Sequence, residues 1–214
     1  MHDVFISYSS KNDEYAHTPV ANRTARRLGA IDADGRGITA IQHAISMQVI
    51  LADNTVLDIA HANYNRKENE LVIYNAHNGT TTGTNAYGTE VQIELLEGEK
   101  WQTTGTMRAR VTKVEDQVGS MPLDKNHAVL SGHGTMATEL KKLSVGDELT
   151  LQFEISFDGN VVNISQAIGS DNYTQILVDG AVAQSGFWNE LHPRTGFGVS
   201  QSRDTTYMLV VDGR

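Results

Sequence analysis

The amino-acid sequence is built from short apolar runs that alternate with turns rich in glycine, asparagine and aspartate. Such runs are typical of β-strands, because a helix needs a longer segment with apolar residues every three or four positions. The runs lie at residues 4–8, 28–35, 45–51, 56–59, 70–75, 89–95, 102–114, 127–130, 148–157, 175–178, 181–184, 195–200 and 206–211. Asp179-Gly180 between two of them is a hairpin-turn signature. With 19 glycines and 3 prolines, the pattern predicts a β-rich fold with tight turns.

Helical patterns are few. Thr18-Pro19 places proline at the first position of a helix that would run to about Arg27. Met136 to Leu143 predicts a second short helix, and residues 161–168 fit either a strand or a short helix. We therefore expect the α+β class: one β-rich domain with mixed or antiparallel sheets and a few helices, without repeats or a linker.

Charge and composition limit the partners. The formal net charge of -9 over 214 residues argues against nucleic acid, because phosphate backbones bind to basic patches. The absence of cysteine excludes disulfides and thiolate chemistry. No apolar run reaches the roughly 20 residues of a membrane span, and the N-terminus lacks the pattern of a signal peptide. We expect a cytoplasmic location; the residues do not indicate an oligomeric state.

Two segments near the C-terminus combine arginine with a carboxylate. Arg194 and Thr195 follow a His-Pro pair, and Asp212-Gly213-Arg214 follows the apolar run 206–211. An arginine so placed can bind a phosphate or carboxylate through two parallel hydrogen bonds. The structural alternatives are a surface arginine beside a hairpin and an Asp-Gly turn. If the two runs are neighbouring strands, both arginines and Asp212 could converge.

Two further segments offer polar groups in glycine-rich surroundings. His133 lies in a loop expected at Ser131–Gly134 after an apolar run, where a ligand could approach a group that titrates near neutral pH. The segment Asn78 to Glu90 is a long loop rich in threonine, glycine and asparagine, whose hydroxyl, amide and N–H groups suit a sugar or a phosphate. A loop histidine without a function and a flexible hairpin tip are the alternatives.

Asp32 and Asp34 are candidate cation ligands or acid/base groups, because they follow a strand and point to one face. A calcium loop also needs a glutamate at a later fixed position, which this sequence lacks. A capped turn is the alternative, and no histidine spacing indicates a metal site.

Seven segments in order resemble the phosphodiester glycosidase family, the domain of the lysosomal "uncovering enzyme", N-acetylglucosamine-1-phosphodiester alpha-N-acetylglucosaminidase, with exopolysaccharide-related members in bacteria. They are Leu71–Asn75, Gly83–Glu90, Val129–Gly134, Ala167–Gly169, Leu177–Gly180, Pro193–Gly198 and Val210–Arg214. The resemblance places a phosphodiester glycosidase-like domain at residues 29–214, preceded by a poorly matched segment at 1–28.

The resemblance implies a hydrolase that cleaves a sugar-1-phosphodiester and releases the sugar, with a glycan or sugar-phosphodiester as partner and no cofactor. It implies that Arg194 and Arg214 hold the diester, with Thr195 and Gly213 beside them. The expected acid/base residues are Asp212, Glu90 and His133, in that order. The loop that contains Thr84 and Asn85 is expected to contact the sugar.

Two departures from the family pattern affect these expectations. Family members continue past Asp-Gly-Arg to a glycine-rich segment of the active site, and they carry aromatic residues after the early carboxylates near Asp32. We therefore expect this chain to bind poorly or to be inactive unless a further segment is supplied. Family members are usually secreted or on the cell surface, in contrast to the cytoplasmic location expected from the N-terminus.

Two other functions stay open. The first is a non-catalytic carbohydrate or cell-surface binding module of the same fold. The second is a TIR-type signalling or NAD-cleaving protein, because residues 2–13 resemble the first strand and loop of a TIR domain. That function requires a parallel sheet with residues 4–8 at its centre.

Overall fold

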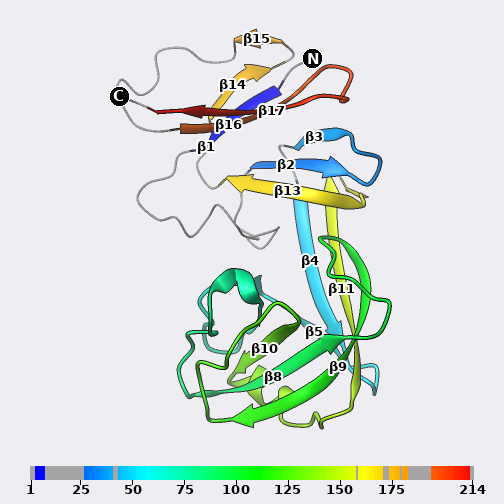
Figure 1. Ribbon diagram of the computed structural model, residues 1–214, viewed down its shortest axis with the longest axis vertical. Coiled ribbons are helices and arrows are strands. Elements are labelled where there is room, and N and C mark those ends of the chain that lie inside the picture. Colours follow the sequence, from blue (N-terminus) through cyan, green and yellow to red (C-terminus); the bar gives the residue numbers. More distant parts are fainter. Residues whose placement is uncertain are drawn as a thin grey trace. The chain divides into compact units, whose positions relative to one another are not determined.

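A computed structural model of the chain describes residues 3–7, 27–40, 43–157, 159–170, 174–178, 180–182 and 194–212. Strands dominate this part of the chain, which contains one short α-helix and one 3-10 segment (Figure 1). The expectation of a β-rich fold is confirmed, whereas the helical part of an α+β fold is represented only by these two short elements. The helix expected at 18–27 lies outside the described residues.

The chain forms two compact units. Unit 1 combines the first part of the chain with residues 155–214, and unit 2 contains residues 45–154. The sequence did not predict this division, because it is made within continuous apolar runs. The chain leaves unit 1 within strand β4 (His43–Ile50) and returns to it within β11 (Glu148–Phe157), so no linker composition marks either crossing.

The described strands of unit 1 form two antiparallel sheets. Their strands are β1 (Asp3–Ser7), β2 (Arg27–Asp32), β3 (Gly37–Ala40), β13 (Ile164–Ser170), β14 (Thr174–Val178), β15 (Ala181–Val182), β16 (Arg194–Val199) and β17 (Thr206–Val211). One sheet has the order β15-β14-β1-β16-β17 and the other the order β13-β2-β3. Strand β1 is therefore the central strand of the first of these sheets.

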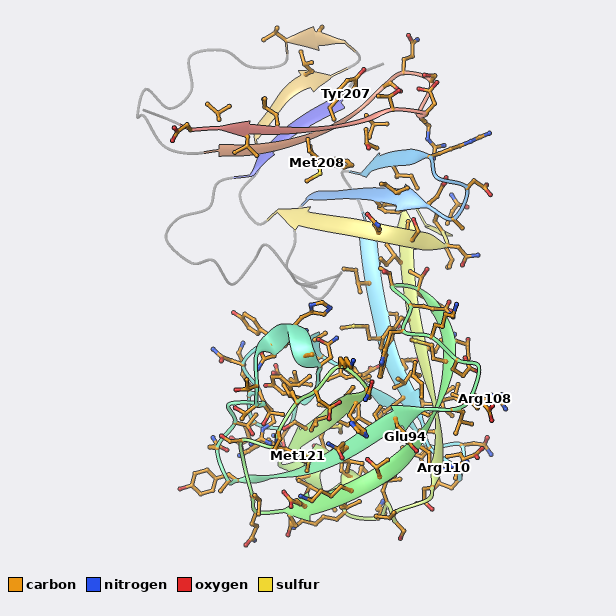
Figure 2. The ribbon with its side chains drawn as sticks, in the orientation of Figure 1. Glu94, Arg108, Arg110, Met121, Tyr207 and Met208 are labelled. Carbon is orange, nitrogen blue, oxygen red and sulfur yellow. The ribbon has the colours of Figure 1, made fainter. Side chains whose placement is uncertain are left out.

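Strand β1 pairs antiparallel with both of its neighbours, β14 and β16. A TIR domain would place this strand in a parallel sheet, so its pairing does not meet the requirement of that function. At the sheet edge, β17 exposes five consecutive apolar residues, Tyr207 to Val211. Figure 2 shows the first two, Tyr207 and Met208, on opposite sides of the strand.

Unit 2 is a curled sheet with the order β5-β4-β11-β9-β8-β10-β7-β6. Besides β4 and β11, its elements are β5 (Val56–Asp58), β6 (His61–Ala62), β7 (Leu71–Tyr74), η2 (Ala76–Asn78), β8 (Gly88–Leu95), β9 (Gly105–Asp116), β10 (His127–His133) and α1 (Thr135–Leu140). Strand β12 (Asn160–Val161) pairs with β11. Of the pairs described, only β6–β7 is parallel, so the expected mixed and antiparallel pairing is confirmed.

Both faces of the unit 2 sheet are covered at β7. All four residues of β7 are buried, and alternate side chains point to opposite faces of a strand. Leu71 and Ile73 join a large apolar cluster on one face, whereas Val72 and Tyr74 join a smaller cluster with Val129 on the other. This second face carries the polar residues described below.

Two sequence expectations change in this region. Ser131, Gly132 and His133 belong to strand β10 rather than to a loop, because their pairing with β8 continues to His133 opposite Gly88. Residues 161–168, which fit either a strand or a helix, form the end of β12 and most of β13.

Candidate functional site

The candidate site is centred on Glu90, a carboxylate without exposed surface on strand β8. Strand register explains which residues surround it: Glu90 lies opposite Ser131 of β10, and Ser131 lies opposite Val72 of β7. Partners across neighbouring strands share one face of a sheet. The two expected motifs around Glu90 and His133, which are more than 40 positions apart in sequence, therefore meet on the second face of the sheet.

Four donors satisfy the Glu90 carboxylate. Oε1 accepts from the hydroxyls of Thr84 at 2.7 Å and Ser131 at 2.8 Å. Oε2 accepts from the hydroxyl of Thr82 at 3.1 Å and from the N–H of Met121 at 2.9 Å. Hydrogen bonds to a charged group are the strong ones, so this carboxylate joins β10, the loop before β8 and the loop after β9.

Arg66, which lies between β6 and β7, is the cation nearest to this centre. Its Nη1 donates to the hydroxyl of Ser131 at 2.7 Å, and Ser131 in turn donates to Glu90. Its Nη2 donates to the Oδ1 of Asn85 at 2.8 Å and to the Asn85 carbonyl oxygen at 3.1 Å. Arg66 thus fixes residues 82–87, which we call the Asn85 loop, to the end of β10.

Burial lowers the pKa of Arg66 from its usual value, and the negative charge of Glu90 opposes this effect. An arginine stays charged in proteins over any ordinary pH. The buried carboxylate and the half-buried guanidinium therefore form a compensated pair, joined through Ser131.

Gly88 makes room for the guanidinium. A Cβ atom at this position would lie 2.7 Å from the Cζ of Arg66 and closer still to the Gly132 carbonyl oxygen. Gly88 has no positive φ angle, so space rather than backbone conformation requires glycine. The glycine of the Tyr-Gly-Thr-Glu motif thus leaves room for both the β10 backbone and the Arg66 guanidinium.

Tyr74 and His133 lie on the same face. The Tyr74 hydroxyl donates to the carbonyl oxygen of Tyr64, and burial, the largest effect, raises the pKa of Tyr74 to about 12. His133 ends β10 opposite Gly88, and its Nδ1 is buried without a hydrogen-bond partner among the described residues. No described residue therefore fixes the inner ring nitrogen of His133 as a donor or an acceptor.

The other expected site residues belong to unit 1. In the antiparallel pair β16–β17, Arg194 lies opposite Val211 and Thr195 opposite Val210. The expectation that Arg194 and Asp212 belong to neighbouring strands is confirmed, since Asp212 directly follows Val211. Asp212 is exposed, while Gly213 and Arg214 lie outside the described residues.

Asp32 adopts the capped turn that was the alternative to a cation site. Its Oδ1 accepts from the N–H groups of Asp34 at 3.1 Å and Arg36 at 2.8 Å, and its Oδ2 accepts from Arg203 at 3.3 Å. Asp34 is exposed. Nowhere in the described part of the chain do three or more acidic or histidine side chains come together as metal ligands.

Arg66 is the residue of the candidate site that the sequence did not reveal. It lies in a charged turn outside the segments of the family resemblance, where nothing distinguishes it from its neighbours Lys67 and Glu68. Arg66 packs against Gly88 and Asn85. Both of these residues lie in the segment Gly83–Glu90 of the family resemblance, whereas Arg66 lies outside every such segment.

Comparison with known proteins identifies the fold alone. No protein-family model and no curated protein matches the chain. A hypothetical protein from Synechocystis has a similar structure, with a TM-score of 0.54 and 15% identity, over 97% of this chain and 39% of that one. A protein from Burkholderia pseudomallei K96243 that is described as exported matches with a TM-score of 0.52 and 17% identity, over 79% of this chain and 41% of that one. The chain thus spans about two fifths of each.

No helix among the described residues is long and apolar enough to cross a membrane.

Proposed function

We propose that the chain belongs to a hydrolase that cleaves a sugar-1-phosphodiester, of the N-acetylglucosamine-1-phosphodiester type, and releases the sugar. The observation that carries the proposal is the meeting of two resembling segments, Gly83–Glu90 and Val129–Gly134, around the buried Glu90. Because the chain spans about two fifths of the solved chains it resembles, the activity is proposed for the whole protein. The exported description of one of them fits a role in surface polysaccharide metabolism.

Within this proposal, His133 is the acid/base residue of unit 2. His133 has an inner nitrogen without a described partner, so its proton can be placed to suit a substrate. Asp212 is exposed at the end of β17, on the strand next to Arg194. For unit 1, taken by itself, the same resemblance proposes Asp212 as an acid/base residue and Arg194 and Arg214 as anion ligands, with Gly213 and Thr195 beside them.

Glu90 is better suited to supporting the site than to proton transfer. Its two oxygens are occupied by four donors, and it has no exposed surface. A general acid or base must come within hydrogen-bond reach of the substrate. We therefore propose that Glu90 holds the Asn85 loop and Ser131 in position.

A carbohydrate-binding module of the same fold is the second candidate. The same observation favours it, because a motif carboxylate that is saturated by protein donors leaves fewer groups for catalysis. A binding module would retain the Asn85 loop and would not depend on the proton of His133.

The two candidates are separated by following free N-acetylglucosamine after incubation with the methyl phosphodiester of N-acetylglucosamine-1-phosphate. The hydrolase is supported if the unsubstituted protein releases the sugar and if this release is lost in His133→Gln and in Asp212→Asn. His77→Gln is the matched control, because His77 is an exposed histidine of η2 in the same unit. Release that survives both substitutions contradicts the assigned roles, and binding of the intact diester without release favours the module.

A further inference from the structure

Arg66 determines which groups the Asn85 loop presents to solvent. Its Nη2 holds the carbonyl oxygen of Asn85 at 3.1 Å, and the hydroxyl of Ser120 donates to the Thr84 carbonyl oxygen at 3.4 Å. Both carbonyl groups are therefore turned toward the protein.

The N–H groups of the same two peptides must point the other way. A trans peptide is planar, with its N–H opposite its C=O, and the chain contains no cis peptide bond among the described residues. The N–H groups of Asn85 and Ala86 thus face away from Ser120 and Arg66. Both residues are exposed, and neither N–H has a partner among the described residues.

The Asn85 side chain adds a third donor. Its Oδ1 accepts from Arg66 at 2.8 Å and from the N–H of Tyr87 at 3.1 Å. Two donors at this atom fix the amide orientation, because a flipped amide would place an NH₂ group against both of them. The Nδ2 of Asn85 is consequently directed away from Arg66.

We infer that Asn85 and Ala86 bind the anionic oxygens of the substrate's phosphodiester, through Asn85 Nδ2 and the two backbone N–H groups. The three groups are all donors, which matches phosphate oxygens that only accept hydrogen bonds. A sugar hydroxyl also donates, and the carbonyl oxygens that could accept from it are held by Arg66 and Ser120. Glu90 compensates the guanidinium behind the loop, so the preference for an anion comes from the three donors.

This inference rests on the proposed function for its choice of a phosphodiester among tetrahedral anions. It changes the role of the loop, which the family resemblance assigned to the sugar. Arg66 acts as a positioning residue, since its hydrogen bonds go to the protein and its effect on the ligand passes through Asn85.

Asn85→Asp is the decisive variant. An aspartate keeps an oxygen for Arg66 and for the Tyr87 N–H, but it replaces the outward NH₂ by a negatively charged oxygen. We expect this variant to remain folded and to bind dimethyl phosphate and inorganic phosphate at least tenfold more weakly. Binding is followed by titration of both anions in ¹H–¹⁵N spectra, in which the Asn85 side-chain amide and the Ala86 N–H of the unsubstituted chain should shift.

Asn126→Asp is the matched control, because it adds the same charge at an exposed asparagine just before β10. It should leave both affinities within twofold. Arg66→Lys should weaken both anions while the Asn85 signals broaden, because a lysine cannot hold the carbonyl oxygen and Oδ1 together.

Three results would overturn the inference. They are equal binding of dimethyl phosphate by folded Asn85→Asp, shifts of the Asn85 amide with N-acetylglucosamine but not with the phosphates, and the absence of any shift with either phosphate. None of these measurements involves turnover. Phosphate binding at Asn85 without hydrolysis would contradict the proposed activity and support this inference. Hydrolysis without phosphate binding at Asn85 would support the proposed activity and contradict this inference.

Discussion

Replacing Glu90 by glutamine tests whether a buried charge organises unit 2. Glutamine has nearly the same shape, but one carboxylate oxygen becomes an NH₂ group. If this group replaces Oε2, it faces the N–H of Met121, a donor that cannot rotate away. If it replaces Oε1, the hydroxyls of Thr84 and Ser131 must turn to accept. The second arrangement costs less free energy, because hydroxyl groups can rotate. In it, the four charge-assisted hydrogen bonds to Glu90 become neutral hydrogen bonds or are lost.

The expected loss follows from typical hydrogen-bond energies. A hydrogen bond to a charged group contributes about 1.5–3 kcal/mol and a neutral one about 0.5–1.5 kcal/mol, so four bonds to Glu90 lose roughly 4 kcal/mol. Removing the buried charge offsets part of this loss of stability, since desolvation of the carboxylate no longer opposes folding. We expect Glu90→Gln to lower the free energy of unfolding by about 2–4 kcal/mol.

Urea denaturation of unit 2 measures this loss, with Glu94→Gln as control. Glu94 lies half-buried on the same strand, opposite Arg110, whose guanidinium pairs with Glu148 at 3.3 Å. Because even a charge in a surface ion pair contributes only about 0–1 kcal/mol, Glu94→Gln should change the free energy of unfolding by less than that amount. A Glu90→Gln loss below about 0.5 kcal/mol, within the range of ordinary surface substitutions, would refute the reasoning.

Three further substitutions test the surroundings of the site. Gly88→Ala should lower the free energy of unfolding by about 1–3 kcal/mol, because the added Cβ meets the Gly132 carbonyl oxygen first and then the Arg66 guanidinium; an unchanged urea midpoint would contradict this packing. The pKa of Tyr74 is raised to about 12, so the neutral hydroxyl stabilises the fold fully below pH 10 and this stabilisation is lost as the pH rises through 12. The free energy of unfolding should therefore fall less steeply above pH 10 in Tyr74→Phe than in the unsubstituted chain. Equal pH dependence in the two proteins would argue against this role of Tyr74. Lys141 and the Thr89 hydroxyl lower the pKa of Asp116. The ionised Asp116 therefore stabilises the fold above about pH 4, and this stabilisation is lost as the pH falls. The difference in urea midpoint between Asp116→Asn and the unsubstituted chain should accordingly be larger at pH 6 than at pH 3, and a constant difference would exclude the linkage.

Local patterns were sufficient to predict most of the strands. The run 148–157 forms β11 and the run 206–211 forms β17 with the expected bounds, because alternating apolar residues and turn-forming residues act over a few positions. The hairpin at Asp179-Gly180 is confirmed by the antiparallel pairing of β14 with β15. Errors of extent arose where glycine interrupts a strand, as at Gly132.

The candidate site could be predicted only in part. Glu90, Thr84, Asn85 and His133 were identified from the sequence, and the structure brings them to one face of one sheet. That Glu90 is saturated by donors was not foreseeable, because its partners Ser131 and Met121 come from segments whose positions depend on strand register.

The sequence by itself determined that the chain is a β-structure, where most strands begin and end, and which segments are rich in groups that bind ligands. The tertiary structure decided how these segments are used. It placed Arg66 on Gly88, turned the Asn85 carbonyl group inward, and divided the chain within β4 and β11. The physical reason is range: backbone conformation follows neighbouring residues, whereas charge pairing and burial depend on contacts such as Arg66 to Ser131, which join residues 65 positions apart.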